Sequence, residues 1–236
     1  MKIITWNCNG AFRNKYEHII SLNADILIIQ ECENPAESKD VKYQNWAENY
    51  LWIGDSKNKG LGVFTSKQIE LQKLDWSNGF EDHNVKHFIP CSVNGNFNLL
   101  AIWTHQNNSP NYAYIGQFWK YFQVNKNKFE NIIIAGDFNS NTIWDKVRRT
   151  WNHSDVVREL SEIGIESLYH HFTYEDHGLE QQPTFYLHKN LEKPYHIDYC
   201  FASEFFIQKF KNIEIGDFVN YKVLSDHNPV LITFEY

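Results

Sequence analysis

The sequence predicts an α/β protein built around a mixed β-sheet. Apolar runs of strand length alternate with segments whose apolar residues recur at helical intervals, a pattern typical of helices packed on a sheet. The run at residues 26–30 is almost entirely apolar, as expected for a strand buried on both faces. Asn94-Gly95 lies between two other strand-like runs and is a strong hairpin signal. Part of the sheet is therefore predicted to be antiparallel.

The individual elements are predicted in chain order. Strands are expected at residues 3–6, 26–30, 60–65, 85–93, 97–104, 132–136, 184–187, 197–202 and 230–234. Helices are expected at residues 15–22, 112–124 and 155–163. For the last of these helices, Ser154 is the expected N-cap and Gly164 the expected stop. Residues 43–52 are ambiguous between helix and loop, and the polar, His-rich residues 169–182 are expected to form a long exposed loop.

Bulk properties narrow the class of protein. A length of 236 residues allows one large domain or two small ones, and the spread of candidate site residues from 7 to 227 favours a single domain over residues 1–236. A net charge of −7 argues against a protein that coats nucleic acid through bulk positive charge. Aromatic residues make up 16% of the chain, so rings beyond those in the core are available to stack on bases or sugars.

The cysteines and the N-terminal residues indicate the compartment. Cysteines at positions 8, 32, 91 and 200 show neither a CxxC pair nor zinc-type histidine spacing, so we expect reduced, buried thiols. A strand follows directly after Met1-Lys2, which leaves no room for a signal peptide, and no apolar run is long enough to span a bilayer. We therefore expect a cytoplasmic protein without a membrane segment, and the sequence implies no protein partner.

Polar residues that can hold a metal ion or a phosphate follow four of the predicted strands. These residues are Asn7, Glu31, His105 and Asp137. Asp198 and the pair Asp226-His227 add two acids and a second histidine near the C-terminus. Because strands carry their end groups to one rim of a sheet, residues far apart in sequence are expected to form one acidic, histidine-bearing pocket. Such a pocket has the outline of a metal-assisted phosphoester-cleaving site.

The chemistry of phosphodiester hydrolysis assigns candidate roles to these residues. The negative charge of a phosphodiester repels a nucleophile, so a catalyst needs a cation on the phosphate and a base for the attacking water. Asn7 and Glu31 offer the oxygen ligands that Mg²⁺ prefers, with Asn9 or Asp226 as possible helpers. Mn²⁺ would serve in the same role.

The remaining residues fit proton transfer and charge stabilisation. Asp137 and Asn139 place a base and a neutral hydrogen-bond donor two residues apart, which suits the orientation of a water beside a phosphate oxygen. His227, if held by Asp198, would face the developing negative charge, and His105 would supply a second donor. Each residue alone has an ordinary structural explanation, such as a turn former or a helix cap. Their joint occurrence favours the catalytic interpretation.

The motifs around these residues resemble the endonuclease/exonuclease/phosphatase superfamily. This group contains deoxyribonuclease I, exonuclease III, abasic-site endonucleases, sphingomyelinases and inositol polyphosphate 5-phosphatases. The matching segments are Thr5-Trp6-Asn7-Cys8-Asn9-Gly10, Ile29-Gln30-Glu31, Trp103-Thr104-His105, Gly136-Asp137-Phe138-Asn139, His196-Ile197-Asp198-Tyr199 and Ser225-Asp226-His227-Asn228-Pro229. They occur in the order of the family and cover essentially the whole chain.

The resemblance implies a fold and a division of labour. The implied fold is a four-layer α/β sandwich of two packed, mixed sheets flanked by helices, similar to deoxyribonuclease I. The implied roles place Asn7 and Glu31 near the metal and Asp226 as a further metal or phosphate partner. In the same comparison Asp137 activates the water, Asn139 and His227 contact the phosphate, and Asp198 supports His227.

Two departures bear on the substrate. Abasic endonucleases of the family carry a Tyr-containing motif where this chain has Trp103-Thr104-His105, and inositol phosphatases carry a Cys-Asp-Arg element near the position of Asp198. The leading hypothesis is a Mg²⁺- or Mn²⁺-dependent nuclease that acts on DNA. The alternatives are a phosphoesterase for small or lipid phosphoesters, favoured by His105 and the acidic net charge, and a binding module that has lost catalysis.

Overall fold

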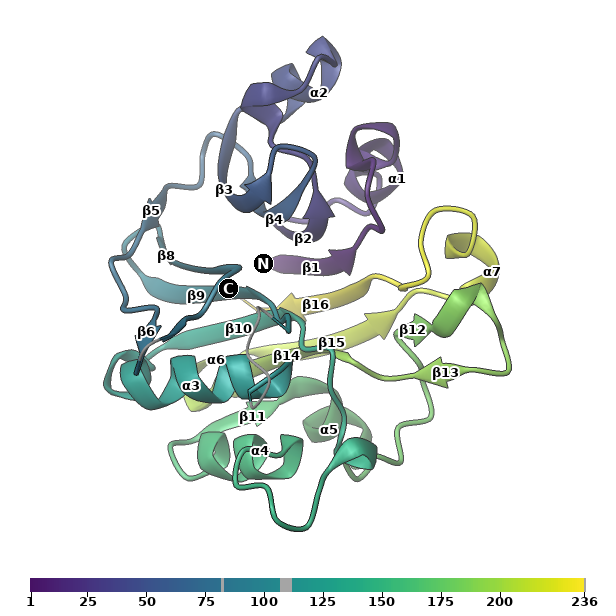
Figure 1. Ribbon diagram of the computed structural model, residues 1–236. Coiled ribbons are helices and arrows are strands. Elements are labelled where there is room, and N and C mark those ends of the chain that lie inside the picture. The colour runs from purple at the N-terminus through teal and green to yellow at the C-terminus, as the bar shows by residue number, and fades with distance from the viewer. Residues whose placement is uncertain (82, 107–111, 236) are drawn as a thin grey trace.

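The computed structural model describes residues 1–81, 83–106 and 112–235, and its largest features are two stacked mixed sheets (Figure 1). Within the described residues each of these sheets has six strands. The strands of the first, called sheet A, are in spatial order β15 (Phe210–Ile215), β16 (Val230–Phe234), β1 (Lys2–Asn7), β2 (Ile26–Cys32), β4 (Lys59–Thr65) and β3 (Asn49–Ser56). Those of sheet B are β11 (Ile165–Ser167), β14 (Asp198–Ser203), β10 (Ile132–Asp137), β9 (Phe97–Trp103), β8 (Phe88–Val93) and β5 (Leu71–Lys73).

Helices and short ribbons surround the two sheets. The α-helices are α1 (Tyr16–Ile20), α2 (Val41–Trp46), α3 (Ile115–Asn125), α4 (His153–Ser161), α5 (Leu168–Thr173), α6 (Glu204–Ile207) and α7 (Phe218–Tyr221). Single turns of 3₁₀-helix occur at η1 (Phe12–Asn14), η2 (Pro35–Glu37), η3 (Lys126–Lys128), η4 (Thr142–Trp144) and η5 (Leu187–Lys189). Two-stranded ribbons are formed by β6 (Gly79–Phe80) with β7 (His83–Asn84), and by β12 (Phe185–Tyr186) with β13 (Pro194–Tyr195).

The alternation of side chains along each strand builds the layers. In β10, Ile133 points into the core between the two sheets, whereas Ile132 and Ile134 belong to a second core on the outer face of sheet B. In β1, Ile3 joins the central core and Ile4 joins a third core on the outer face of sheet A. Helices α3 and α4 cover the outer face of sheet B, and α1 and α2 cover that of sheet A (Figure 1). The predicted four-layer sandwich is therefore confirmed.

Parallel pairing brings the candidate residues to one end of the sandwich. β1 runs parallel to β2, and β9 runs parallel to β10, while the other pairs in the two sheets are antiparallel. The carboxyl ends of β1 and β2 therefore lie together in sheet A, and those of β9 and β10 lie together in sheet B. The two sheets also contact each other through β1 and β10.

Most predicted elements occur, with shifted ends. The ambiguous segment 43–52 is divided between the end of α2 and the first half of β3, and the hairpin turn at Asn94-Gly95 joins β8 to β9. The predicted N-cap Ser154 is wrong. Asn152 caps α4 instead, in a capping box in which the Asp155 side chain accepts the Asn152 backbone N–H. Sequence patterns missed β15, which pairs with β16.

The largest difference concerns residues 169–182, which were expected to form a long exposed loop. Their first residues form most of α5, and the Leu168 and Tyr169 side chains are buried in the core between the sheets. Residues 174–182 lie outside helices and strands, and Tyr174 and Leu179 are exposed, so the prediction of an exposed loop holds for this second half of the segment. No helix in the described part of the chain is long and apolar enough to cross a membrane.

Candidate active site

Strand ends from both sheets meet around one buried carboxylate. Asp137 is the last residue of β10, and its register partner on the neighbouring strand β14 is Asp198. Asn7, the last residue of β1 in sheet A, donates from Nδ2 to Asp137 Oδ2 at 2.9 Å. Residues 130 positions apart in sequence are thus joined directly across the two sheets.

Asp137 is completely buried and held by three hydrogen bonds. Besides Asn7, the backbone N–H of Asn139 donates to Oδ1 at 2.8 Å and the Asn139 side chain donates to Oδ2 at 2.9 Å. The Asn139 side-chain amide also donates to the Thr104 carbonyl at 3.1 Å. Asn139 has a φ of 46°, a left-handed conformation that Asn tolerates better than most residues. This tight turn lets one asparagine contact the carboxylate through both its backbone and its side chain.

His227 and Asp198 form a buried pair beside Asp137. The Nδ1 atom of His227 lies 2.9 Å from Asp198 Oδ2, and both side chains are almost fully buried. The backbone of His227 is fixed as well, because its carbonyl accepts a hydrogen bond from the Trp6 indole at 2.9 Å. One ligand-type atom from each of Asp137, Asp198 and His227 lies within 4.8 Å of the others.

Burial and mutual charge shift the pKa values of this group. Burial alone would lower the pKa of His227, but the charge and hydrogen bond of Asp198 and the charge of Asp137 outweigh it and raise that pKa to about 9. Burial and the charge of Asp198 raise the pKa of Asp137 to about 7, against the lowering effects of His227 and of the hydrogen bonds from Asn7 and Asn139. Histidine protonated at neutral pH and an aspartate that titrates near neutrality are suited to acid and base roles.

Glu31 reaches the site from a bulge in β2. The pairing of β2 with β4 shifts register between Gln30 and Cys32, and Glu31 adopts a φ of 64° at this point. Bulges redirect side chains, and a strained conformation at a non-glycine residue is frequent at functional sites. The Glu31 carboxylate lies 2.9 Å from the Lys59 ammonium, and it keeps part of its surface exposed.

Asp226 is placed by a serine that the sequence analysis gave no role. The Ser225 hydroxyl donates to the Asn7 carbonyl at 2.7 Å and accepts the backbone N–H of His227 at 3.0 Å. The Asp226 carboxylate lies 3.4 Å from the same hydroxyl, a longer contact than the one that the hydroxyl makes with the Asn7 carbonyl. Ser225 therefore couples the end of β1 to the segment that carries Asp226 and His227.

His105 lies at the Glu31 side of the site. Its ring contacts Trp103 and His87, with centroid distances of 4.3 and 5.1 Å. Burial and the nearby charge of Lys59 lower its pKa, and the charge of Glu31 opposes this shift. Lys59, which no sequence pattern marked, thus faces both Glu31 and His105 across the β2–β4 bulge.

The donor set fits a hard divalent cation. Carboxylate oxygens of Asp137 and Asp198 lie together beside the Asn7 amide, and such oxygens are the preferred ligands of Mg²⁺ and Mn²⁺. The described contact of Glu31 is with Lys59, on the His105 side, rather than with these residues. Within the described residues, Asp198 Oδ1 is buried without a hydrogen-bond partner. A buried carboxylate oxygen that lacks a partner is costly, and a nearby cation or a cation-bound water would satisfy it.

The fold and the acid–histidine group together define a phosphoester-hydrolysing enzyme. The chain belongs to the endonuclease/exonuclease/phosphatase family, and the match covers residues 4–227. Enzymes of this family depend on divalent metal ions, which agrees with the oxygen-rich donor set. No curated protein matches the sequence.

Solved structures support the fold. A 3′-5′ exonuclease from Neisseria meningitidis superimposes with a TM-score of 0.71 at 18% identity, and the alignment covers 100% of both chains. An AP endonuclease from Archaeoglobus fulgidus superimposes with a TM-score of 0.74 at 16% identity, again over 100% of both chains. The catalytic domain of APE2 from Xenopus laevis gives a TM-score of 0.64 at 13% identity, over 100% of this chain and 92% of that one. At identities of 13% to 18%, the likeness shows a shared architecture alone.

Proposed function

We propose that this protein is a Mg²⁺- or Mn²⁺-dependent phosphodiester hydrolase that acts on DNA. The observation that carries the proposal is the position of Asp137, which Asn7 and Asn139 hold beside the Asp198–His227 pair. A base and a protonated histidine a few ångströms apart can act on one phosphate. The base takes the proton of the attacking water, and the histidine donates a hydrogen bond to a charged phosphate oxygen.

Each buried residue has a distinct task in this proposal. Asp137 takes the proton of the attacking water, and its raised pKa of about 7 favours this transfer near neutral pH. Asp198 holds Nδ1 of His227 and keeps the ring protonated, which leaves Nε2 to donate to a phosphate oxygen. Asn139 fixes the orientation of Asp137, and it would donate to the phosphate by releasing its hydrogen bond to the Thr104 carbonyl. His105 supplies a second donor from the Glu31 side.

Asn7 and Glu31 are the residues proposed to hold the metal ion, with Asp226 as a helper. When bound, the ion neutralises charge on the phosphate. The Glu31 carboxylate is already aimed at a cation, because it pairs with the Lys59 ammonium in this structure. The bulge that carries Glu31 and the Ser225 hydroxyl that fixes the end of β1 keep the two ligand-bearing strand ends in place.

A series of rings leading away from His227 supports DNA as the substrate. Phe185 packs against the His227 ring at 4.5 Å, Tyr195 stacks on Phe185 at 6.3 Å, and Trp144 contacts Tyr195 at 5.3 Å. Trp144 is 43% exposed, so its face is available to a base. A structure of the Neisseria protein, described as a 3′ phosphatase, contains a product DNA hairpin. Trp151 is not part of this series of rings, because it packs against Tyr112 beside α3.

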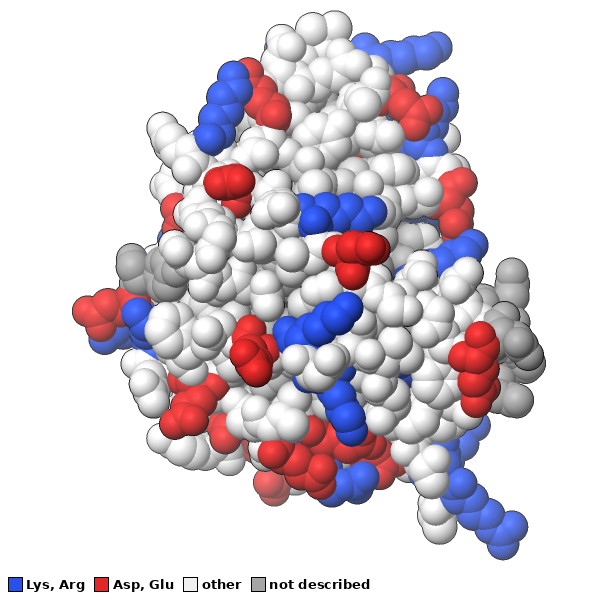
Figure 2. Space-filling model, turned by 90° about the vertical axis from the view of Figure 1, so that its left-hand side faces the viewer, with Lys and Arg blue, Asp and Glu red and all other residues white. Residues whose placement is uncertain are grey.

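A small or lipid phosphoester is the second candidate substrate. The net charge of −7 favours it, because DNA-binding surfaces are usually basic. On the face seen in Figure 2, lysine and arginine side chains are interspersed with aspartate and glutamate. Near the site, Lys15 is close enough to Lys189 and Asp226 for both charges to affect its pKa. The negative charge of Asp226 therefore partly offsets the positive charge of the two lysines.

Cleavage assays separate the two candidates. We expect cleavage of plasmid or oligonucleotide DNA with Mg²⁺ or Mn²⁺, and a loss of at least about 100-fold in the Asp137→Asn and His227→Ala variants. Asp75→Asn is the matched control, since Asp75 is an exposed carboxylate away from these strand ends. Release of phosphate or head groups from small phosphoesters without nucleic-acid cleavage would select the second candidate.

Trp144→Ala tests the aromatic series directly. Loss of one base-stacking ring costs about 1–3 kcal/mol of binding, so KM for DNA should rise about 5-fold or more. Hydrolysis of bis(p-nitrophenyl) phosphate by the same variant should be unchanged, because this small ester does not reach the ring. Equal effects on both substrates would remove the argument for DNA.

A cytoplasmic location belongs to the same proposal. All four cysteines are free and buried, which suits a reducing compartment. Fractionation of cells that express a tagged chain would test it.

A further inference from the structure

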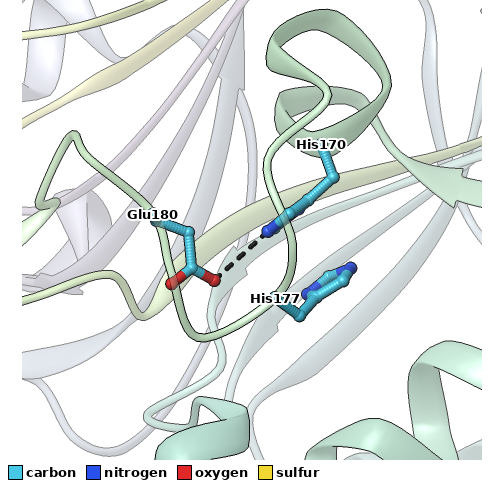
Figure 3. A group of neighbouring side chains, drawn as sticks. All are labelled: His170, His177 and Glu180. Carbon is cyan, nitrogen blue, oxygen red and sulfur yellow. Dashed lines mark hydrogen bonds and ion pairs between the residues drawn. The ribbon is translucent and has the colours of Figure 1, made fainter.

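A second group of metal-ligand side chains lies on α5 and the loop that follows it. His170 comes from α5, and His177 and Glu180 come from the loop (Figure 3). One ligand atom from each residue lies within 4.8 Å of the other two. His170 Nε2 and Glu180 Oε1 are 3.2 Å apart, close to the separation of about 3.3 Å between neighbouring ligands of a tetrahedral zinc ion. We call these three residues the His170–His177–Glu180 group.

The group is partly buried and incompletely paired. The side chains of His170 and Glu180 are 9% and 4% exposed. His177 Nδ1 is a buried atom without a hydrogen-bond partner in the described residues. The rings of His170 and His177 stack with centroids 3.4 Å apart and an interplanar angle of 16°. A buried nitrogen without a partner weakens the fold unless another group satisfies it.

Hydrogen bonds from neighbouring residues hold the group in place. His170 Nδ1 is 2.7 Å from the Ser167 hydroxyl, which leaves Nε2 directed at Glu180. The Asn141 side-chain amide is 3.1 Å from each oxygen of the Glu180 carboxylate. Histidine and carboxylate ligands of protein-bound metals are commonly oriented by such outer contacts. Gly178, with a φ of 93°, lies so close to Thr142 that a Cβ there would clash, and it brings His177 and Glu180 to the same place.

Charge at this location also favours a cation. Burial and the neighbouring His170 lower the pKa of His177 to about 3, so its ring is neutral at physiological pH. Burial likewise lowers the pKa values of His153 and His196 beside it. Burial would raise the pKa of Glu180, but hydrogen bonds from His170, from backbone N–H groups and from Asn141 lower it to about 2. The Glu180 carboxylate thus lies within ligand distance of two imidazole rings, and buried charges are normally paired or bound to metals.

We propose that the His170–His177–Glu180 group binds one Zn²⁺ ion, separately from the metal of the phosphoester site. Two imidazoles and one carboxylate form a donor set that suits zinc, with water in the fourth position, whereas Mg²⁺ prefers oxygen ligands throughout. The ion would link α5 to the loop, and His170 would bind it through Nε2 as the tautomer whose proton is on Nδ1, where the Ser167 hydroxyl accepts it. Neither the substrate nor the activity proposed above is required for this assignment.

The ion would also stabilise the backbone that positions residues of the phosphoester site. Asn141, which contacts Glu180, lies two residues after Asn139. Thr184, four residues after Glu180, accepts the backbone N–H of Asp198 on its hydroxyl at 3.0 Å. The same threonine accepts the backbone N–H of Asn228 on its carbonyl at 2.7 Å. The loop that carries two of the three zinc ligands therefore continues directly into contacts that position Asp198 and the residue after His227.

Zinc titration of chelator-treated protein tests the assignment. By calorimetry we expect one tight Zn²⁺ site per chain that excess Mg²⁺ does not compete for, and the Glu31→Gln variant should retain it. Glu180→Gln, which preserves size, and His177→Ala should each lower Zn²⁺ affinity about 100-fold or more. His171→Gln is the matched control, because His171 is a neighbouring histidine of α5 that pairs with exposed Glu166 instead. Folding of each variant is verified by circular dichroism.

Stability and hydrogen exchange give independent readouts. Zn²⁺ at about 100 times its Kd should raise the Tm of the wild type by about 5–10 °C and leave that of Glu180→Gln unchanged. It should also slow amide exchange in residues 170–184. The proposal is overturned if Zn²⁺ does not bind, or if affinity is the same in both ligand variants as in His171→Gln. It is equally overturned if binding is lost in Glu31→Gln, because the ion would then belong to the phosphoester site.

Discussion

The phosphoester site and the His170–His177–Glu180 group are assembled in opposite ways. Asn7 and Asp137 meet although 130 positions separate them, and each is the last residue of a buried strand. His170 and Glu180 are only ten positions apart and lie on a short helix and a loop. The first group depends on two sheets packing in register. The second depends on one local turn and on the burial of α5.

This difference decides how visible each group is in the sequence. A polar residue after an apolar strand stands out, and its position at a sheet rim follows from the strand pattern. Histidines and acids within a polar segment are interpreted as solvated loop residues, because nothing local shows that His170, His177 and Glu180 come together. Asn141 joins the two regions, since it follows the turn after β10 and contacts Glu180. The predictions below test how separate the regions are.

Asp137→Asn should have the largest effect. Loss of the proposed base should lower kcat for DNA cleavage by about 10³–10⁴-fold, whereas Zn²⁺ binding should be unaffected. Steady-state assays with Mg²⁺ and parallel zinc calorimetry measure both quantities, with Asp75→Asn as the control. A variant that loses zinc along with activity would show that the two regions act as one.

Asp198→Asn should lower kcat by about 10²-fold and change its pH dependence. The charge of Asp198 helps raise the pKa of His227 to about 9, so wild-type activity should fall as the pH rises through about 9 and His227 loses its proton. Without that charge burial prevails, the pKa falls, and the alkaline decline moves to lower pH. A pH–rate profile of both proteins measures the shift. An alkaline limb at the same pH in both would exclude His227 as the group that must stay protonated.

Asn141→Ala should weaken the connection between the regions. Its amide lies within hydrogen-bond distance of Glu180, of the His196 carbonyl and of the Tyr199 hydroxyl, in buried or partly buried surroundings. Loss of these buried hydrogen bonds should reduce the free energy of unfolding by about 2 kcal/mol, or about 30-fold in the folding equilibrium. Urea denaturation measures this change against Asn58→Ala, a substitution at an exposed turn. Equal stability of the two variants would mean that the connection is not structural.

His177→Ala should have the smallest effect on catalysis. With Mg²⁺ as the only added metal, kcat should change by less than about 3-fold, because His177 makes no contact with the strand-end residues. The same preparation should lose Zn²⁺ affinity. A decrease in kcat comparable to that of Asp198→Asn would move His177 into the phosphoester site.

Much of the fold and of the candidate site follows from local sequence. The buried strands at β1, β2, β9 and β10 and the hairpin at Asn94-Gly95 were predictable from apolar runs and turn chemistry. The roles of Asn7, Glu31, Asp198, His227 and the other candidate residues remain predictions that the variants above test. Patterns failed where packing decided the outcome. Ser154 is as good a cap by type as Asn152, and only the position of Asp155 in the folded turn selects Asn152.

The sequence by itself determined where the buried strands lie and that Asn7 and Asp137 end two of them, since apolar runs and the polar residues that follow them are local properties. Tertiary structure alone decided which of those ends meet. Only the packing of the two sheets places the Asn7 amide on Asp137, and only the bulge in β2 pairs Glu31 with Lys59. It also brought His170, His177 and Glu180 of a polar, histidine-rich segment within ligand distance of one another. Burial and pairing are sums over distant contacts, so no local pattern contains them.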